Sequence, residues 1–226
     1  MLAAHLPPLA ASLFSLLAIG SLLLAFVMIG SRWLKDYLLA FSAQSWLIAL
    51  LSAAVGYYGH YTELYLIAVL TALFRGVVLP WMILRVVNRL DVDRELHERL
   101  SPSTCLVVGG LLTLFAFVVS THLAQSLGLD GTIAVLALTV MLSMKLIGFL
   151  MLAIRGEAIS HVLGLLVLEN GIFLGSQILV PGMPLLIELV ILFDLLVVVA
   201  CFGVLVRYLS AHAGATNARA LRRLVG

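Results

Sequence analysis

The run IAVLALTVMLSMKLIGFLMLAI (Ile133–Ile154) contains 22 residues and one charged side chain, Lys145. A helix of about 20 predominantly apolar residues is long enough to cross the hydrocarbon core of a bilayer. The apolar residues are continuous here, whereas the strands of a membrane barrel alternate between lipid-facing and lumen-facing residues. The run therefore predicts a transmembrane helix.

The composition of the whole chain agrees with this prediction. Of its 226 residues, 63% are hydrophobic and 11% are charged, and the mean hydropathy is +1.20. Soluble domains average about 45–50% apolar and about 25% charged residues. The composition excludes a soluble domain, a disordered chain and a nucleic-acid-binding protein. We expect the lipid bilayer to surround most of the chain.

Six further apolar runs have the length of a spanning helix. The chain is therefore predicted to be an all-α, polytopic integral membrane protein with about seven transmembrane helices. We expect residues 1–104 to form three helices and a cytoplasmic loop, and residues 105–226 to form four helices and a basic cytoplasmic tail. The first run is followed by further spans, so we expect it to remain in the mature protein. The six runs are Leu9–Ile29, Tyr37–Gly56, Leu64–Val87, Leu106–Leu123, Val162–Val180 and Leu185–Leu209.

Basic residues are distributed unevenly between the two ends of these helices. Eleven of the 13 Lys and Arg residues fall on one side of the predicted membrane. The connections on the other side contain none. The positive-inside rule then predicts a multi-pass protein of the cytoplasmic (inner) membrane with its N-terminus outside and its C-terminus in the cytoplasm. The eleven are Arg32, Lys35, Arg85, Arg89, Arg94, Arg99, Arg155, Arg207, Arg219, Arg222 and Arg223.

Five charged residues lie inside the predicted spans: Arg75, Lys145, Glu169, Glu188 and Asp194. A single ionised residue near the bilayer centre costs about 2.5–3.5 kcal/mol even on the lenient insertion scale. Counting along the helices from the cytoplasmic arginines places both bases about 15 Å, and Glu169 and Asp194 about 20 Å, from the inner helix ends. Glu188 is expected nearer the outer boundary. Four of the charges thus share one layer of the membrane.

Two interpretations of this layer remain open. Protonatable groups at one depth on different helices can form a lateral proton or ion relay, and intramembrane charges often mark such pathways. Alternatively, the bases form fixed ion pairs with the acids and lock the helices together. Arg75 keeps its proton at any physiological pH, so it is better interpreted as a fixed charge than as a proton carrier.

The predicted helix Val162–Val180 has two different faces. Gly164, Gly171 and Gly175 share one face, and the spacing of the last two permits close contact with a neighbouring helix. The side of Glu169 is turned towards a cavity or a partner subunit, or it forms hydrogen bonds to other helices of the chain. That side also carries Asn170, Phe173, Ser176 and Gln177.

Pro80 follows Arg75 by five residues within one predicted span. Proline removes a backbone hydrogen bond, so we expect a kink near the buried base. The chain contains no phosphate-binding loop, nucleophile motif or metal-ligand spacing. We therefore predict no catalytic residue, no metal and no cofactor.

Two stretches, GLLVLENGIFL (Gly164–Leu174) and MPLLIELVILFDLLVVV (Met183–Val199), resemble component E of hydrogenase-4 and formate hydrogenlyase-type membrane complexes. The last three predicted helices are similar to the NuoK-like subunit of respiratory complex I. In this comparison Glu169 matches the buried glutamate of the second NuoK helix, and Asp194 looks like the counterpart of the glutamate in the third. Asp194 is one methylene shorter than that glutamate.

The resemblance extends to the stretch TALFRGVVLPW (Thr71–Trp81), where Arg75 looks like the family's buried basic position. It implies a non-catalytic membrane-arm subunit that works beside antiporter-like and other membrane subunits. It also implies a hydrogenase-like or formate-oxidising cytoplasmic arm, whose energy the membrane subunits couple to proton or cation movement. Two alternatives are a purely structural membrane anchor of such a complex and a stand-alone secondary transporter.

Overall fold

The computed structural model describes residues 8–90, 100–129, 131–155 and 158–179. All elements in these ranges are helical, as predicted. They are α1 (Pro8–Gly30), α2 (Leu34–Gly59), α3 (Glu63–Leu70), η2 (Thr71–Val78), α4 (Leu79–Leu90), α5 (Pro102–Ser126), α6 (Thr132–Ile154) and α7 (Ala158–Leu179).

Five helices of the described residues are long and apolar enough to cross a membrane: α1, α2, the continuous segment Glu63–Arg85, α5 and α6. The chain is therefore a helical membrane protein. The predicted helix Val162–Val180 corresponds to α7. The predicted helix Leu185–Leu209 lies outside the described residues, so the total of about seven spans and the NuoK-like arrangement stay predictions.

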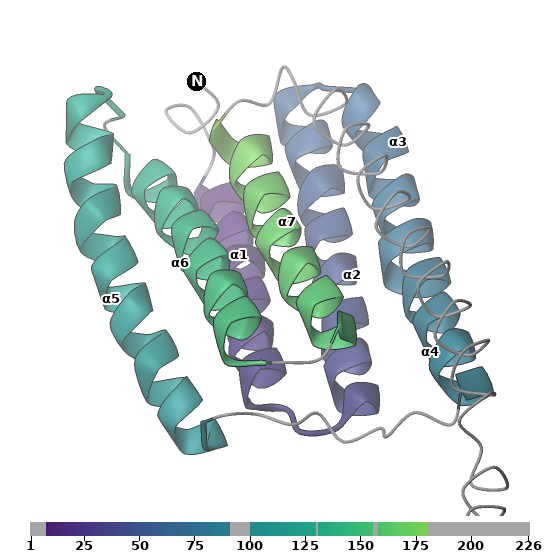
Figure 1. Cartoon of the computed structure of the whole chain (residues 1–226). Helices are drawn as coiled ribbons and strands as arrows, with labels where there is room; N and C mark the ends of the chain where they lie inside the picture. Colours follow the sequence, from purple (N-terminus) through teal and green to yellow (C-terminus); the bar gives the residue numbers. More distant parts are fainter. Residues whose placement is uncertain (1–7, 91–99, 130, 156–157, 180–226) are drawn as a thin grey trace, which may run out of the picture.

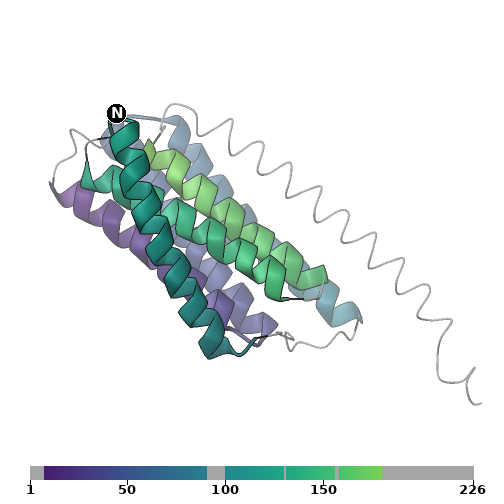
Figure 2. The ribbon, with the colours of Figure 1, turned by 60° about the vertical axis from the view of Figure 1, so that its left-hand side comes forward.

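The helices lie side by side in one bundle (Figures 1 and 2). α7 lies between α6 and α2, and α1 contacts α2, α5 and α6. The segment of α3, η2 and α4 lies beside α2 at one edge of the bundle, and α5 lies at the opposite edge. Helices from both predicted regions of the chain thus pack against one another, and α7 faces two neighbours at once.

Glycines allow α6 and α7 to form the most extensive helix pair of the bundle. A Cβ atom on Gly148 would lie 2.8 Å from the carbonyl oxygen of Gly164. A Cβ atom on Gly171 would lie 2.7 Å from the Cβ of Met144, and one on Gly175 would lie 2.8 Å from the Cβ of Met141. Lipid tails are as apolar as leucine, so membrane helices associate mainly through close packing of this kind. Gly164, Gly171 and Gly175 all lie in this interface.

Arg155 ties the end of α6 to the end of α1. Its side chain is 2% exposed, and Nη2 donates to the carbonyl oxygens of Met28, Ile29 and Ser31 at 3.1–3.4 Å. The last carbonyl groups of a helix have no partner within the helix and attract a cation. The guanidinium also lies 5.8 Å from the ring centroid of Tyr37. Arg155 therefore caps α1 from another helix, a role that its place in a predicted loop does not reveal.

We predict that Gly171→Ala lowers the free energy of unfolding by about 1–3 kcal/mol, because the added methyl overpacks a contact between two helix backbones. Thermal unfolding in detergent measures the change. The matched control is Gly110→Ala on α5, where a Cβ atom meets nothing within 4 Å. Alanine favours a helix over glycine by about 0.5–1 kcal/mol, so the control should unfold at the same or a higher temperature. Equal unfolding temperatures of the two variants would contradict the prediction.

We predict that Arg155→Gln destabilises the protein by about 1.5–3 kcal/mol, the range for hydrogen bonds that involve a charged group. The variant leaves the last carbonyls of α1 without their cation. Arg85→Gln is the control, since Arg85 is exposed and contacts the ring of Trp81. The same unfolding measurement compares the two, and a larger loss in Arg85→Gln would refute the capping role.

Candidate functional site

The backbone around Arg75 departs from regular α-helix. The segment η2 is a π-helix, and the backbone N–H of Leu79 donates to the carbonyl oxygen of Phe74, five residues earlier. Pro80 has no N–H, and its ring would clash with the carbonyl of Gly76 in a regular α-helix. That carbonyl instead accepts a hydrogen bond from the Ser42 hydroxyl of α2. The irregularity predicted from Pro80 thus takes the form of a π-helical stretch, a feature often found at functional sites.

Gly76 brings this irregular segment close to α2. A Cβ atom at this position would lie 3.0 Å from Nε1 and 3.2 Å from Cδ1 of Trp46. A larger side chain would push η2 away from α2 and separate the Gly76 carbonyl from Ser42. The glycine therefore holds Arg75, its neighbour in sequence, against the interior of the bundle.

The guanidinium of Arg75 is buried between helices, and the side chain is 1% exposed. Nη1 donates to Oδ1 of Asn170 on α7 at 2.8 Å. The guanidinium carbon lies 5.4 Å from the ring centroid of Phe173, also on α7, within the range of a cation–π interaction. Arg75 thus meets the face of α7 that carries its polar side chains.

Hydrogen bonds continue from Arg75 through two buried amides. Asn170 Nδ2 donates to Gln44 Oε1 at 2.8 Å, and Gln44 Nε2 donates to the carbonyl oxygen of Ser21 at 2.7 Å. Both amide side chains are fully buried. We call this series, from Arg75 through Asn170 and Gln44 to Ser21, the Arg75 chain. It joins η2, α7, α2 and α1, and hydrogen bonds in series strengthen one another in a medium of low dielectric.

Glu169 and Lys145 lie at the depth of the Arg75 chain. Glu169 adjoins Asn170, is 7% exposed and shares a face of α7 with Phe173, one turn later. Lys145 on α6 is partly buried, and its backbone nitrogen is 3.5 Å from the position of a Cβ atom on Gly171. The structure therefore places Arg75, Lys145 and Glu169 in one layer of the bundle. Asp194 and Glu188 lie outside the described residues.

This layer combines a permanent charge with titratable groups. Arg75 keeps its proton and supplies a fixed positive field, whereas a carboxylate or an amine can take up and release a proton. The amides of Asn170 and Gln44 hold the guanidinium in place, because each accepts a hydrogen bond through its oxygen and donates one to the next group through its nitrogen. Among the described residues, His, Cys, Asp and Glu side chains form no group that could hold a metal ion.

The partners on α2 are the part of the site that sequence reasoning missed. Hydrogen bonds from Asn170 and Gln177 to other helices are one of the predicted alternatives, and both residues form them. Asn170 Nδ2 donates to Gln44 Oε1, and Gln177 Nε2 donates to Ser52 Oγ at 2.6 Å. A signal for the α2 partners was present, because Gln44 and Ser52 are polar residues within an apolar run. The sequences of two apolar spans do not reveal which of their polar residues are in contact.

Comparisons with known proteins give a relative but no fold or family. No protein-family model and no solved structure matches the chain. The chain is similar to the uncharacterized protein Rv0085 of Mycobacterium tuberculosis, with 29% identity over 211 residues. The alignment covers 92% of this chain and 94% of that protein, so the similarity is not confined to one span or motif.

We predict that Asn170→Leu lowers the free energy of unfolding by about 1.5–3 kcal/mol, because it removes the acceptor of a charged donor. Gln125→Leu, at an exposed position near the end of α5, is the control and should change stability by about 0.5 kcal/mol or less. The double variant Gln44→Leu/Asn170→Leu should lose less than the sum of the single variants, because the two amides share a bond. Strict additivity in the double-mutant cycle would show that the Arg75 chain does not act as a unit.

Proposed function

We propose that the protein is a membrane-arm subunit of a hydrogenase-4 or formate hydrogenlyase-like complex, related to complex I, and that its buried charges contribute to proton or cation translocation or to its coupling. The observation that carries the proposal is the layer of the charged residues Arg75, Lys145 and Glu169 within a predominantly apolar bundle. Charged groups in such a place are costly and usually serve a substrate or ion pathway.

The geometry around Glu169 supports a titratable role for this residue. It is buried in the same layer as the permanent cation Arg75, which is bound to the next residue, Asn170. A carboxyl group buried in the layer of a fixed cation is the kind of intramembrane charge that marks proton and ion pathways. In the proposed complex, a redox-driven change in another subunit would move a proton through this layer.

The sequence resemblance supports the choice of complex. The stretch around Glu169 and Asn170 resembles component E of hydrogenase-4, and Arg75 stands where that family has a buried base. The proposed partners are antiporter-like and other membrane-arm subunits and a hydrogenase-like or formate-oxidising cytoplasmic arm. The proposed location is the inner membrane, with the N-terminus outside and the C-terminus in the cytoplasm, because the basic residues gather at one end of the helices.

A structural anchor is the second candidate, and the Arg75 chain favours it. The guanidinium donates to Asn170 and lies against the ring of Phe173, and the chain joins four helical elements. Such a network fixes the relative positions of helices without moving an ion. The two candidates predict different results when Glu169 is neutralised.

We predict that Glu169→Gln with Asp194→Asn abolishes ion translocation by the native complex and leaves its assembly unchanged, because both variants keep size and hydrogen bonding but cannot release a proton. The measurement is substrate-driven proton or sodium uptake into inverted membrane vesicles, together with the yield of partner subunits after purification in mild detergent. The control is Glu63→Gln at the exposed start of α3.

Each outcome selects one candidate. Lost ion uptake with intact co-purification supports the coupling role. Lost co-purification supports the structural anchor, and unchanged uptake refutes the coupling role. Recovery of the tagged wild-type protein without any other subunit would refute the proposed complex itself.

A further inference from the structure

Polar and apolar side chains alternate along the interface between α2 and α7. On α7, Asn170, Phe173 and Gln177 are spaced by three and four residues and therefore lie on one face. On α2, Gln44, Ile48 and Ser52 follow one another at intervals of four residues. All six side chains are buried. The two helices thus present the same order of polar, apolar and polar residues to each other.

The first polar layer is the Arg75 chain, in which Asn170 meets Gln44. The second polar layer is formed by Gln177 and Ser52. Gln177 Nε2 donates to Ser52 Oγ at 2.6 Å, and that hydroxyl donates to the carbonyl oxygen of Ile48 at 3.0 Å. Oε1 of Gln177 has no hydrogen-bond partner among the described residues, although the side chain is fully buried. Reversing the amide would leave its nitrogen without an acceptor instead, so one atom of this amide lacks a partner among the described residues either way.

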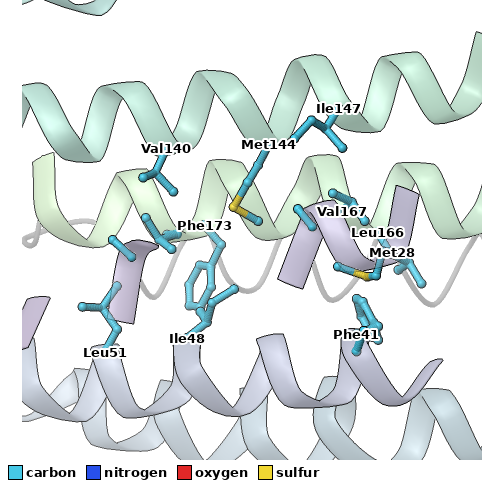
Figure 3. Packing of buried hydrophobic residues seen from close by; sticks show 14 of the residues in the cluster. Met28, Phe41, Ile48, Leu51, Val140, Met144, Ile147, Leu166, Val167 and Phe173 are labelled. Carbon is cyan, nitrogen blue, oxygen red and sulfur yellow. The ribbon is translucent and has the colours of Figure 1, made fainter. Parts of the chain in front are cut away.

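Phe173 and Ile48 separate these two polar layers. The ring of Phe173 points from α7 towards α2 and lies beside Ile48 (Figure 3), and both side chains are 0% exposed. Seven residues separate Asn170 from Gln177 and eight separate Gln44 from Ser52, which corresponds to about 10 Å and about 12 Å along the helices. The cation of Arg75 lies against the same ring.

We propose that Phe173, with Ile48, forms an apolar gate between the Arg75 chain and the polar layer of Gln177 and Ser52. The inference rests on the proposed function, since it adds a barrier to the proposed ion path. A proton crosses a protein along water and polar groups, and an apolar constriction stops it by excluding water. Displacement of the ring would let water connect the Gln177 amide to the Arg75 chain. The contact of the ring with Arg75 ties the position of the gate to the charge of that layer.

The test is the passive proton permeability of the purified full-length chain in lipid vesicles. A potassium gradient with valinomycin drives protons, and a pH-sensitive dye inside the vesicles reports their entry. Vesicles with the wild-type protein should admit protons slowly, and Phe173→Ala should raise the rate of proton entry at least tenfold. Ile48→Ala removes most of the α2 side chain of the same apolar layer and should raise the rate of proton entry less. This variant supplies the test if Phe173→Ala does not fold. Phe149→Ala, at a position on α6 that is 57% exposed, should match wild type.

A further variant separates gating from loosened packing. Phe173→Ala/Gln177→Leu removes the polar layer behind the gate, so its leak should return towards that of wild type. Two results would overturn the gate. One is that vesicles with folded Phe173→Ala are no more permeable to protons than vesicles with the wild-type protein. The other is that the added Gln177→Leu leaves the proton leak of Phe173→Ala unchanged. The assay needs no partner subunit, so failure of the gate leaves the result for Glu169 in the complex unaffected. A leak through Phe173→Ala alongside unaltered coupling in the Glu169 variant would keep the gate and refute the coupling role of Glu169.

Discussion

The arrangement of the bundle depends on the burial of one guanidinium, that of Arg75, within a membrane span. A group that never loses its charge must find acceptors and polarisable surfaces inside the protein. Pro80 opens the backbone of its helix, Gly76 lets that helix approach α2, and Asn170 of α7 accepts from the cation. Gln44 then holds Asn170. Each of these residues has a defined place because the cation is buried there, and together they set the relative rotation of η2, α2 and α7.

Close backbone contact is the second physical condition. Four glycines leave the interface of α6 and α7 without side chains at their positions, so the two helices approach closely: Gly148, Gly164, Gly171 and Gly175. The opposite face of α7 then contacts α2. Without a hydrophobic driving force between helices in lipid, packing and hydrogen bonds set the arrangement. The two faces of α7 therefore act together. The glycine face packs closely against α6, and the amide face forms hydrogen bonds to α2.

Much of the fold could be predicted from the sequence because span length and apolar composition are local properties. Six of the seven predicted runs are helices in the described residues. The face of glycines on α7 was also predictable from helical spacing. The role of Arg155 could not be predicted, because the positive-inside rule counts a cation at a helix end as a residue exposed to water. In the structure the α1 carbonyls reach it, and it becomes a buried cap.

The sequence by itself determined that this is a helical membrane protein, that Arg75, Lys145 and Glu169 lie at similar depth along their helices, and that α7 has one face of glycines. Depth follows from counting 1.5 Å per residue along a helix. Only the tertiary structure decided that Arg75 meets Asn170, that Gln44 extends the chain to α1, and that Phe173 stands between two polar layers. These contacts depend on which helices are neighbours and how each is rotated about its axis. Neither quantity is a property of a single span, because both arise from the packing of all the helices together.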